Sequence, residues 1–349
     1  MTQVGIIGCG TIAKFHYEGY ERAGAKIAHV CDMNPDAAQV VAYRYGARTS
    51  TDYRVLLDDP EVDLVSVTTF SGLHKEIALA GMAAGKGVVC EKTLTDSAQS
   101  SAELAKAADQ SGVFFTTAYM KRFFPAVQQA KTLLADMGQI ISIHARTWQP
   151  WDWWNNDLPE EVLSHPSDVI RRNGGGVLVC GGSHIIDLLH YFGGRPSKVC
   201  GQMHIREGLD FDTQANAMLW LENGGLAHLE ACWHPLGYTG YERNGWDERL
   251  EINTVKGKLD LFTPLWNQPT KNGALLVHQD AFTGQTMEYR YPAVNPFDLE
   301  MAEIVRRFEA KEPGFPSVWD GYVVDEVIAH ITRSAKTDAV LNIGWSERK

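Results

Sequence analysis

Residues 4–19, VGIIGCGTIAKFHYEG, decide the fold of the first half of this chain. The apolar run 4–7 predicts a buried strand, Gly8 and Gly10 predict a tight turn, and the residues after them predict a helix. The spacing is G-x-G-x-x-A, with Ala13 small enough for close helix–strand packing. Gly10 has no side chain to keep a phosphate from the backbone, and the N–H groups at a helix start attract anions. The stretch predicts a dinucleotide-binding turn.

An acidic residue follows at the spacing that such a turn requires. Residues 26–31, KIAHVC, predict a second strand that ends at Asp32. An acid about 20 residues after the glycines suits the ribose 2′-hydroxyl of NAD and disfavours the 2′-phosphate of NADP. Glycines in an ordinary surface turn are the alternative. Position, spacing and acid together favour the dinucleotide.

Composition excludes several classes of protein. The 349 residues suggest two domains, and 44% apolar with 21% charged residues is typical of a globular chain. The net charge of −11 disfavours nucleic acids and anionic membranes as partners. The six cysteines show no C-x-x-C spacing, the chain begins directly with a strand, and no apolar run approaches 18 residues. We therefore expect a cytoplasmic protein.

The order of predicted elements divides the chain into two halves. Over residues 1–121, buried strands alternate with helices, which predicts an α/β Rossmann domain with a doubly wound parallel sheet. Over residues 122–349, long alternating strands joined by glycine turns predict an α+β domain with an open, largely antiparallel sheet and helices on one face. We expect the second domain to bind substrate and to pair copies of the chain into a homodimer or homotetramer.

Lys92 is a candidate for chemistry in the first half. It follows the predicted strand 88–90 and Glu91, at the strand end where ligands bind in parallel sheets. An ammonium group there could stabilise a developing alkoxide beside a nicotinamide ring. A solvated surface lysine is the alternative.

His184 is the candidate in the second half, within a predicted helix over residues 177–192. A histidine can act as general base near neutral pH, and Asp187, three residues later, could orient it. Cys180 lies four residues earlier, on the same face of an α-helix. Gly181, Gly182 and Ser183 are poor helix formers, so we expect a ligand or another backbone close to them. A purely structural histidine is the alternative.

Tryptophans dominate a predicted loop after the strand at 139–147. Trp151, Trp153 and Trp154, with Trp148 before them, could stack on sugar rings, or could instead form an oligomer contact or anchor the loop. Arg171 could bind an acidic group of a substrate, although its position favours a helix-end surface charge. The histidines show no tight ligand spacing, so we expect no metal.

Several motifs together resemble the Gfo/Idh/MocA family of sugar and polyol oxidoreductases. Besides the glycine turn, residues 69–74 are similar to its T-P-N-x-x-H segment and 91–93 to its E-K-P motif, with Thr93 for proline. Residues 119–125 resemble its entry to the second domain, and 174–187 resemble its G-G-G…D-x-G-x-H-x-x-D helix. Cys180 stands at the usual aspartate place, and a neutral thiol cannot supply a carboxylate's charge.

The resemblance implies an NAD-dependent dehydrogenase acting on a secondary alcohol of a sugar, polyol or glycoside. Lys92 and His184 would be catalytic, with Cys180 and Asp187 beside them. The implied cofactor contacts are Gly8, Gly10, Thr11, Ile12, Asp32, Met33, Thr69, His74, Glu91, Lys92 and Met120. The implied substrate contacts are Lys92, Trp151, Trp153, Trp154, Arg171 and His184.

Two other functions stay open at this point. A hydrolase or lyase could keep NAD bound and oxidise a sugar only transiently. A regulatory protein could bind NAD(H) without turnover, which the thiol at Cys180 would favour.

Overall fold

The computed structural model describes residues 1–150, 167–266, 268 and 271–346, and its internal contacts divide the chain into two compact units. The first unit comprises residues 1–120 with 296–325 and Ser346, and the second comprises 121–295 with 326–345. Residues 296–325, which the sequence predicts to belong to the second domain, make their contacts within the first unit. Helix α9 (Pro296–Glu309) packs on α1 (Ala13–Arg22), and the Phe15 and Phe297 rings stack with centroids 4.6 Å apart.

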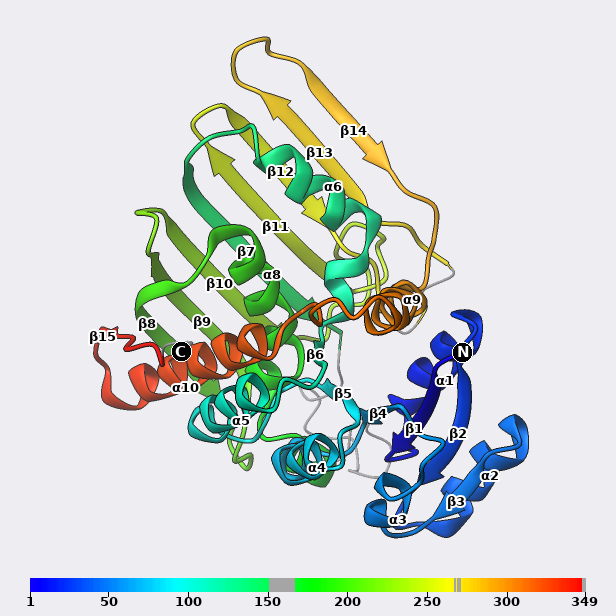
Figure 1. The fold of residues 1–349 in the computed structure, drawn as a ribbon. Coiled ribbons are helices and arrows are strands. Elements are labelled where there is room, and N and C mark those ends of the chain that lie inside the picture. The colour runs from blue at the N-terminus through cyan, green and yellow to red at the C-terminus, as the bar shows by residue number, and fades with distance from the viewer. Residues whose placement is uncertain (151–166, 267, 269–270, 347–349) are drawn as a thin grey trace. The chain divides into compact units, whose positions relative to one another are not determined.

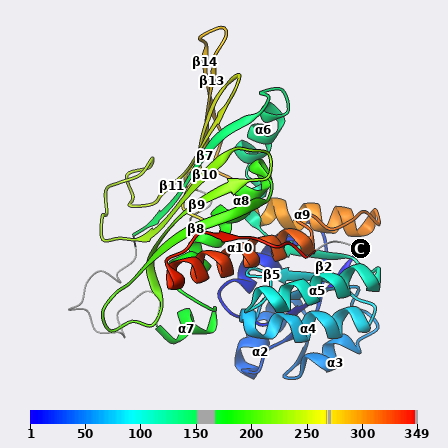
Figure 2. The ribbon, with the colours of Figure 1, turned by 90° about the vertical axis from the view of Figure 1, so that its left-hand side faces the viewer.

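The first unit is built on a six-stranded parallel sheet with the order β3-β2-β1-β4-β5-β6 (Figure 1). This confirms the predicted doubly wound fold. The strands are β1 (Gln3–Ile7), β2 (Lys26–Cys31), β3 (Arg48–Ser50), β4 (Leu64–Val67), β5 (Gly87–Glu91) and β6 (Phe115–Ala118). Besides α1 and α9, its helices are α2 (Pro35–Tyr45), α3 (Tyr53–Leu57), α4 (Ser71–Ala83) and α5 (Ala98–Ser111). α1 packs with α9, and α4 packs with α5, on opposite faces of the sheet (Figure 2).

Helix ends in this unit follow local chemistry. The side chains of Asn34, Asp52 and Ser97 accept hydrogen bonds from the first-turn backbone N–H groups of α2, α3 and α5. Ser97 is therefore the N-cap of α5. Gly46 ends α2 with φ 64°, a left-handed conformation that glycine adopts without steric cost.

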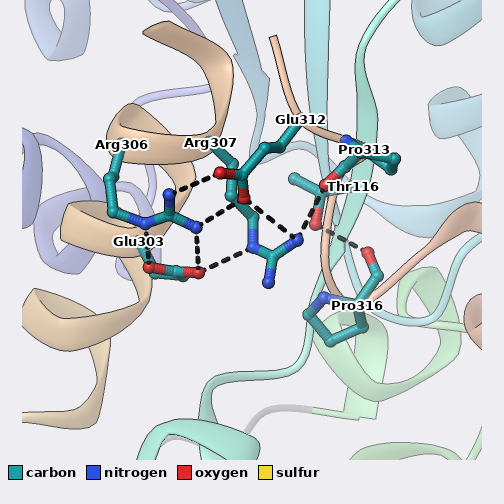
Figure 3. Close-up of polar contacts among 7 residues, drawn as sticks. All are labelled: Thr116, Glu303, Arg306, Arg307, Glu312, Pro313 and Pro316. Atoms are coloured by element: carbon teal, nitrogen blue, oxygen red, sulfur yellow. Dashed lines mark hydrogen bonds and ion pairs between the residues drawn. The ribbon is translucent and has the colours of Figure 1, made fainter. Parts of the chain in front are cut away.

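The connection after α9 is held by charged side chains, drawn in Figure 3. Arg306 binds the carboxylates of Glu303 and Glu312, and Arg307 donates to Glu303 at 2.7 Å and to the Pro313 carbonyl at 3.1 Å. Beyond this connection, the Pro316 carbonyl accepts a hydrogen bond from Thr116 of β6.

The second unit is built on a nine-stranded sheet with the order β14-β13-β12-β11-β7-β10-β9-β8-β15. Adjacent strands in this sheet are antiparallel except for β7 and β10, which run parallel. The sheet is therefore mixed and mostly antiparallel. The strands are β7 (Ile140–Gln149), β8 (Pro196–Ile205), β9 (Asp212–Leu221), β10 (Leu226–Trp233), β11 (Asp247–Thr254), β12 (Gly257–Phe262), β13 (Leu275–Asp280), β14 (Thr286–Arg290) and β15 (Leu341–Asn342).

Helices α6 (Pro125–Leu134) and α8 (Ser183–Gly193) lie against one face of this sheet (Figures 1 and 2). The 3₁₀ turn η1 (Met120–Phe123) precedes α6, α7 is Ser167–Arg172, and the π-helical turn η4 (Leu178–Gly182) precedes α8. The long helix α10 (Val318–Thr337) begins in the first unit and ends in the second. Within the described residues, no helix is both long and apolar enough to span a bilayer.

Candidate functional site

The candidate residues fall into two groups, one in each unit, and the glycine turn heads the first. Gly8 follows β1 with φ 95°, and a Cβ there would lie 2.8 Å from the Thr68 carbonyl oxygen. Only glycine fits both constraints. A Cβ at Gly10 would meet no atom within 4 Å, so the space beside this backbone is open to a phosphate.

Asp32 follows β2 and is bound directly to the glycine turn. Its Oδ2 accepts a hydrogen bond from the Cys9 N–H at 2.7 Å, and its Oδ1 accepts one from the Asn34 N–H at 2.8 Å. Each carboxylate oxygen keeps a second lone pair, which could accept from a ribose hydroxyl. Thr11 and Met33 are exposed beside the turn and Ile12 is half-buried, so the surroundings of Asp32 fit a dinucleotide.

The open space at Gly10 yields a prediction. We expect Gly10→Ala to raise the Kd for NADH by at least about tenfold, about 1.4 kcal/mol, because the new methyl group would occupy the place of the pyrophosphate. The urea midpoint should stay the same, since that methyl meets no protein atom within 4 Å. Gly8→Ala is the matched control and should lower the midpoint itself. Unchanged NADH binding by Gly10→Ala in fluorescence titration would contradict the cofactor assignment.

Lys92 follows β5, and its neighbour Glu91 is buried in a hydrogen-bonded chain. Glu91 Oε1 lies 2.8 Å from His16 Nε2, and His16 Nδ1 lies 2.7 Å from Ser66 Oγ. Glu91 Oε2 accepts from the Lys92 N–H at 2.9 Å. Burial acts to raise the pKa of Glu91, but the hydrogen bonds and charges of His16 and Lys92 lower this pKa overall, which favours the ionised carboxylate. Lys92 itself is half-buried.

His74 joins two loops at this edge of the sheet. Its Nδ1 lies 2.9 Å from the Thr93 carbonyl oxygen and its Nε2 lies 3.0 Å from the Thr69 carbonyl oxygen. Burial lowers the pKa of His74. The hydrogen bonds with the two carbonyl groups act to raise this pKa but do not outweigh burial. The imidazole therefore contacts backbone on both sides, at Thr69 and at Thr93. The peptide between Lys92 and Thr93, just before the contacted carbonyl, is cis. Thr69 is half-buried at this edge, and Met120 is buried after β6.

The second group lies on η4 and α8. The predicted single helix is instead a π turn followed by an α-helix, and the chain ahead of it is held by Asp212 from β9. Asp212 Oδ1 accepts from the Gly176 N–H at 3.1 Å, and Oδ2 accepts from the Leu178 N–H at 2.8 Å. Burial raises the pKa of Asp212, and these hydrogen bonds oppose the rise.

A neighbouring side chain leaves room only for glycine at position 181. The sequence predicts a ligand or another backbone close to this residue. A Cβ at Gly181 would lie 2.3 Å from Gln149 Nε2. Gln149, at the end of β7, accepts from Trp233 Nε1 at 3.0 Å, so it cannot move aside without losing that bond. Cys180 on the same π turn is half-buried, and its thiol donates to the Gly175 carbonyl at 3.6 Å. π turns are frequent at functional sites.

His184 is half-buried in the first turn of α8, and Asp187 lies one turn later. Asp187 is fully buried and faces Arg122, whose Nε and Nη2 donate to its two oxygens at 2.9 and 2.6 Å. The Arg122 guanidinium also lies 4.7 Å from the centre of the Tyr191 ring. This bidentate pair anchors α8, while the orientation of His184 by Asp187 stays a prediction.

A second buried pair supports the sheet. Lys121 Nζ contacts Glu248, which also accepts from Thr147 Oγ1 at 2.8 Å and from Thr263 Oγ1 at 2.5 Å. Lys121 and Glu248 are each at most 2% exposed, and breaking such a pair leaves a buried charge. Sequence reasoning missed Glu248 because 126 residues separate it from Lys121. The basic pair 121–122 entering the second unit was the available signal.

The remaining candidates are placed as follows. Trp151, Trp153 and Trp154 lie outside the described residues, and Trp148 lies in β7 rather than on the predicted loop. Arg171 is exposed and its Nε lies 2.9 Å from each carboxylate oxygen of Asp210. In the part of the chain that the structure describes, no three His, Cys, Asp or Glu side chains are grouped to hold a metal.

Two models of one family match the chain. Residues 2–119 match the oxidoreductase family with the NAD-binding Rossmann fold, and residues 127–260 match the GFO/IDH/MocA C-terminal domain. The chain is 28% identical over 289 residues to levoglucosan dehydrogenase of Pseudarthrobacter phenanthrenivorans, which covers 72% of this chain and 73% of that protein. It is also 28% identical to inositol 2-dehydrogenase 2 of Saccharopolyspora erythraea, over 97% of this chain and 95% of that protein.

A solved structure shows the same fold. A levoglucosan dehydrogenase in complex with NADH and levoglucosan superposes with a TM-score of 0.85, at 23% identity, over 98% of this chain and 99% of that one. With its glycine turn, its Asp32 and both domains matched, this chain belongs to the GFO/IDH/MocA oxidoreductase family and carries that family's NAD-binding Rossmann domain.

Proposed function

We propose that the protein is an NAD-dependent dehydrogenase that oxidises a secondary alcohol of a sugar, polyol or glycoside. The observation that carries the proposal is the glycine turn bound to Asp32, at the same sheet edge as Lys92. Dehydrogenases of levoglucosan and inositol are among its relatives. Gly8, Gly10 and Asp32 would hold NAD, with Thr11, Ile12, Met33, Thr69 and Met120 near it.

In the proposed chemistry, one side chain of the protein accepts a proton and another supplies a positive charge. Bound NAD supplies a hydride acceptor. His184 takes the proton from the substrate hydroxyl, and the Lys92 ammonium stabilises the developing alkoxide. The Glu91 carboxylate, bound to the Lys92 N–H, helps to hold this residue in place. Tryptophans and Arg171 are proposed to bind the rest of the substrate.

Turnover on a panel of anhydrosugars, inositols and aldoses tests the proposal. We expect absorbance at 340 nm to rise with NAD and an active substrate. NADP should give a rate at least about tenfold lower, because the Asp32 carboxylate repels a 2′-phosphate. Absence of turnover by a protein that binds NADH would contradict the dehydrogenase assignment.

The thiol at Cys180 favours a second candidate function, an NAD(H)-binding regulator without turnover. The thiol donates to the Gly175 carbonyl and offers no carboxylate charge at this position. NADH binding without activity in the wild type, with activity in Cys180→Asp, would support the regulator. A hydrolase or lyase with transient oxidation would instead break a glycosidic bond, require NAD and accumulate no NADH.

We further propose the organisation of the protein. The first unit binds the dinucleotide, and the second binds substrate and pairs copies into a homodimer or homotetramer through the nine-stranded sheet. All six cysteines are free thiols, which suits the reducing cytoplasm. Light scattering after gel filtration measures the oligomeric state, and a monomeric mass would overturn the pairing.

A further inference from the structure

The first half of α10 lies against the loop that follows Lys92. The chain enters α10 from Pro316, whose carbonyl accepts from Thr116 Oγ1 at 2.7 Å (Figure 3) and from the Thr117 N–H at 3.1 Å. Ser317 and Asp320 then form a reciprocal cap, because the Ser317 N–H donates to the Asp320 carboxylate at 2.7 Å and Ser317 Oγ accepts from the Asp320 N–H at 3.2 Å. The start of α10 is therefore fixed to β6.

Gly321 brings this helix close to the loop. A Cβ at Gly321 would lie 2.7 Å from Thr117 Oγ1 and 3.0 Å from Leu94 Cβ. Leu94 is two residues after Lys92 and is fully buried. Helix and loop are thus packed at a distance that only glycine permits.

Asp325 lies one turn after Gly321, on the same helix face. Its Oδ2 accepts a hydrogen bond from the Thr95 N–H at 3.0 Å and one from Ser101 Oγ at 2.6 Å. Thr95 Oγ1 and Ser101 Oγ are 2.7 Å apart, which closes a buried ring through the Asp325 and Ser101 side chains and through both the hydroxyl and the backbone N–H of Thr95. Asp325 is 5% exposed, and its other oxygen has no hydrogen-bond partner.

The carboxyl group therefore accepts hydrogen bonds from the loop, at Thr95, and from α5, at Ser101. Burial raises the pKa of Asp325 to about 7, and hydrogen bonds from Ser101 and from the Thr95 and Leu94 backbone oppose the rise. The nearby acid Asp96 adds to it. Burying a carboxyl group costs free energy that its hydrogen bonds must offset, so these bonds fix its position.

We propose that Asp325 is a positioning residue for Lys92, holding the loop 93–95 from one side while His74 holds the Thr93 carbonyl from the other. This inference rests on the proposed function in one respect, because the catalytic role of Lys92 comes from that function. Only two residues lie between Lys92 and Thr95, so a shift of the Thr95 backbone is passed along a short segment to the ammonium. Asp325 acts through the loop and does not touch substrate.

Hydrogen exchange and labelling test the positioning without any substrate. In Asp325→Ala we expect the amides of Leu94 and Thr95 to exchange at least about tenfold faster, and the rate of acetylation of Lys92 Nζ to change at least about threefold. Asp325→Asn keeps an acceptor oxygen and should restore both rates. Ser101→Ala, which removes one donor and keeps the carboxyl group, should give an intermediate effect if the alanine variant at 325 does not fold.

Asp59→Ala is the matched control. Asp59 is also buried in the first unit, but it contacts His29 and Arg48 and none of the candidate site residues. It should lower the urea midpoint without changing exchange at 94–95. Unchanged exchange and labelling in Asp325→Ala would overturn the proposal, as would equal changes in Asp59→Ala.

Turnover separates this inference from the proposed function. With an active wild type, Asp325→Ala should lower kcat about tenfold while KM for NAD changes less than about threefold, and Asp325→Asn should recover most of kcat. A wild type without turnover would defeat the dehydrogenase assignment alone, since exchange and labelling would still decide whether Asp325 holds the loop.

Discussion

Lys92→Ala is expected to lower kcat by about 100- to 1,000-fold, the loss typical of removing one group that stabilises a developing oxyanion. Lys92 follows the carboxyl end of β5, and alanine removes its amino group without adding bulk. The Kd for NADH should change only a few-fold, because Gly8, Gly10 and Asp32 are untouched. Initial rates at saturating NAD and NADH fluorescence titration measure the two quantities.

Lys75→Ala serves as the control for this variant. Lys75 is another lysine of the first unit, on α4, and it pairs with Glu103 at the surface. Its loss should leave kcat unchanged, since exposed ion pairs contribute little. Full activity of Lys92→Ala would remove this residue from the chemistry, and with it the proposed stabilisation of the alkoxide.

His184→Ala is expected to lower kcat by about 100- to 10,000-fold, the range for loss of a general base. The remaining rate should rise steadily with pH as hydroxide or the ionised substrate replaces the base, whereas the wild-type rate should level off once the histidine is neutral. A pH–rate profile of the two proteins measures this difference. KM for NAD should stay within a few-fold, because the glycine turn belongs to the other unit.

His190→Ala is the matched control on the same helix. His190 is half-buried near the end of α8, and we expect its replacement to affect stability more than kcat. Parallel pH profiles for wild type and His184→Ala would contradict the role of His184. Asp187 is a poor variant for this test, because its removal leaves Arg122 buried without its carboxylate.

Much of the first unit could be predicted because its signals are local. The caps at Asn34 and Asp52 and the stop at Gly46 depend on side chains within a few residues of the backbone that they serve. The contact between Asp32 and the turn joins strand ends that a parallel sheet places side by side. Strand–helix alternation then implies the doubly wound order.

Contacts between residues far apart in the chain could not be predicted in this way. Arg122 pairs with Asp187, and Lys121 pairs with Glu248. No repeating pattern in the sequence indicates either pair. The π turn at 178–182 depends on Gln149 from β7 and on Asp212 from β9. The sequence showed only that Gly181 needed a close neighbour, without saying which.

The sequence by itself predicts where NAD binds in this protein, because a tight turn, an open backbone and an acid are properties of Gly8, Gly10 and Asp32 themselves. Only the tertiary structure decided how the catalytic candidates are held. The carboxylate of Asp325 and the imidazole of His74 fix the loop after Lys92, and Asp212 fixes the chain before His184. The physical reason is that a buried polar group is satisfied by whichever donor the fold brings within about 3 Å, whatever its distance along the chain.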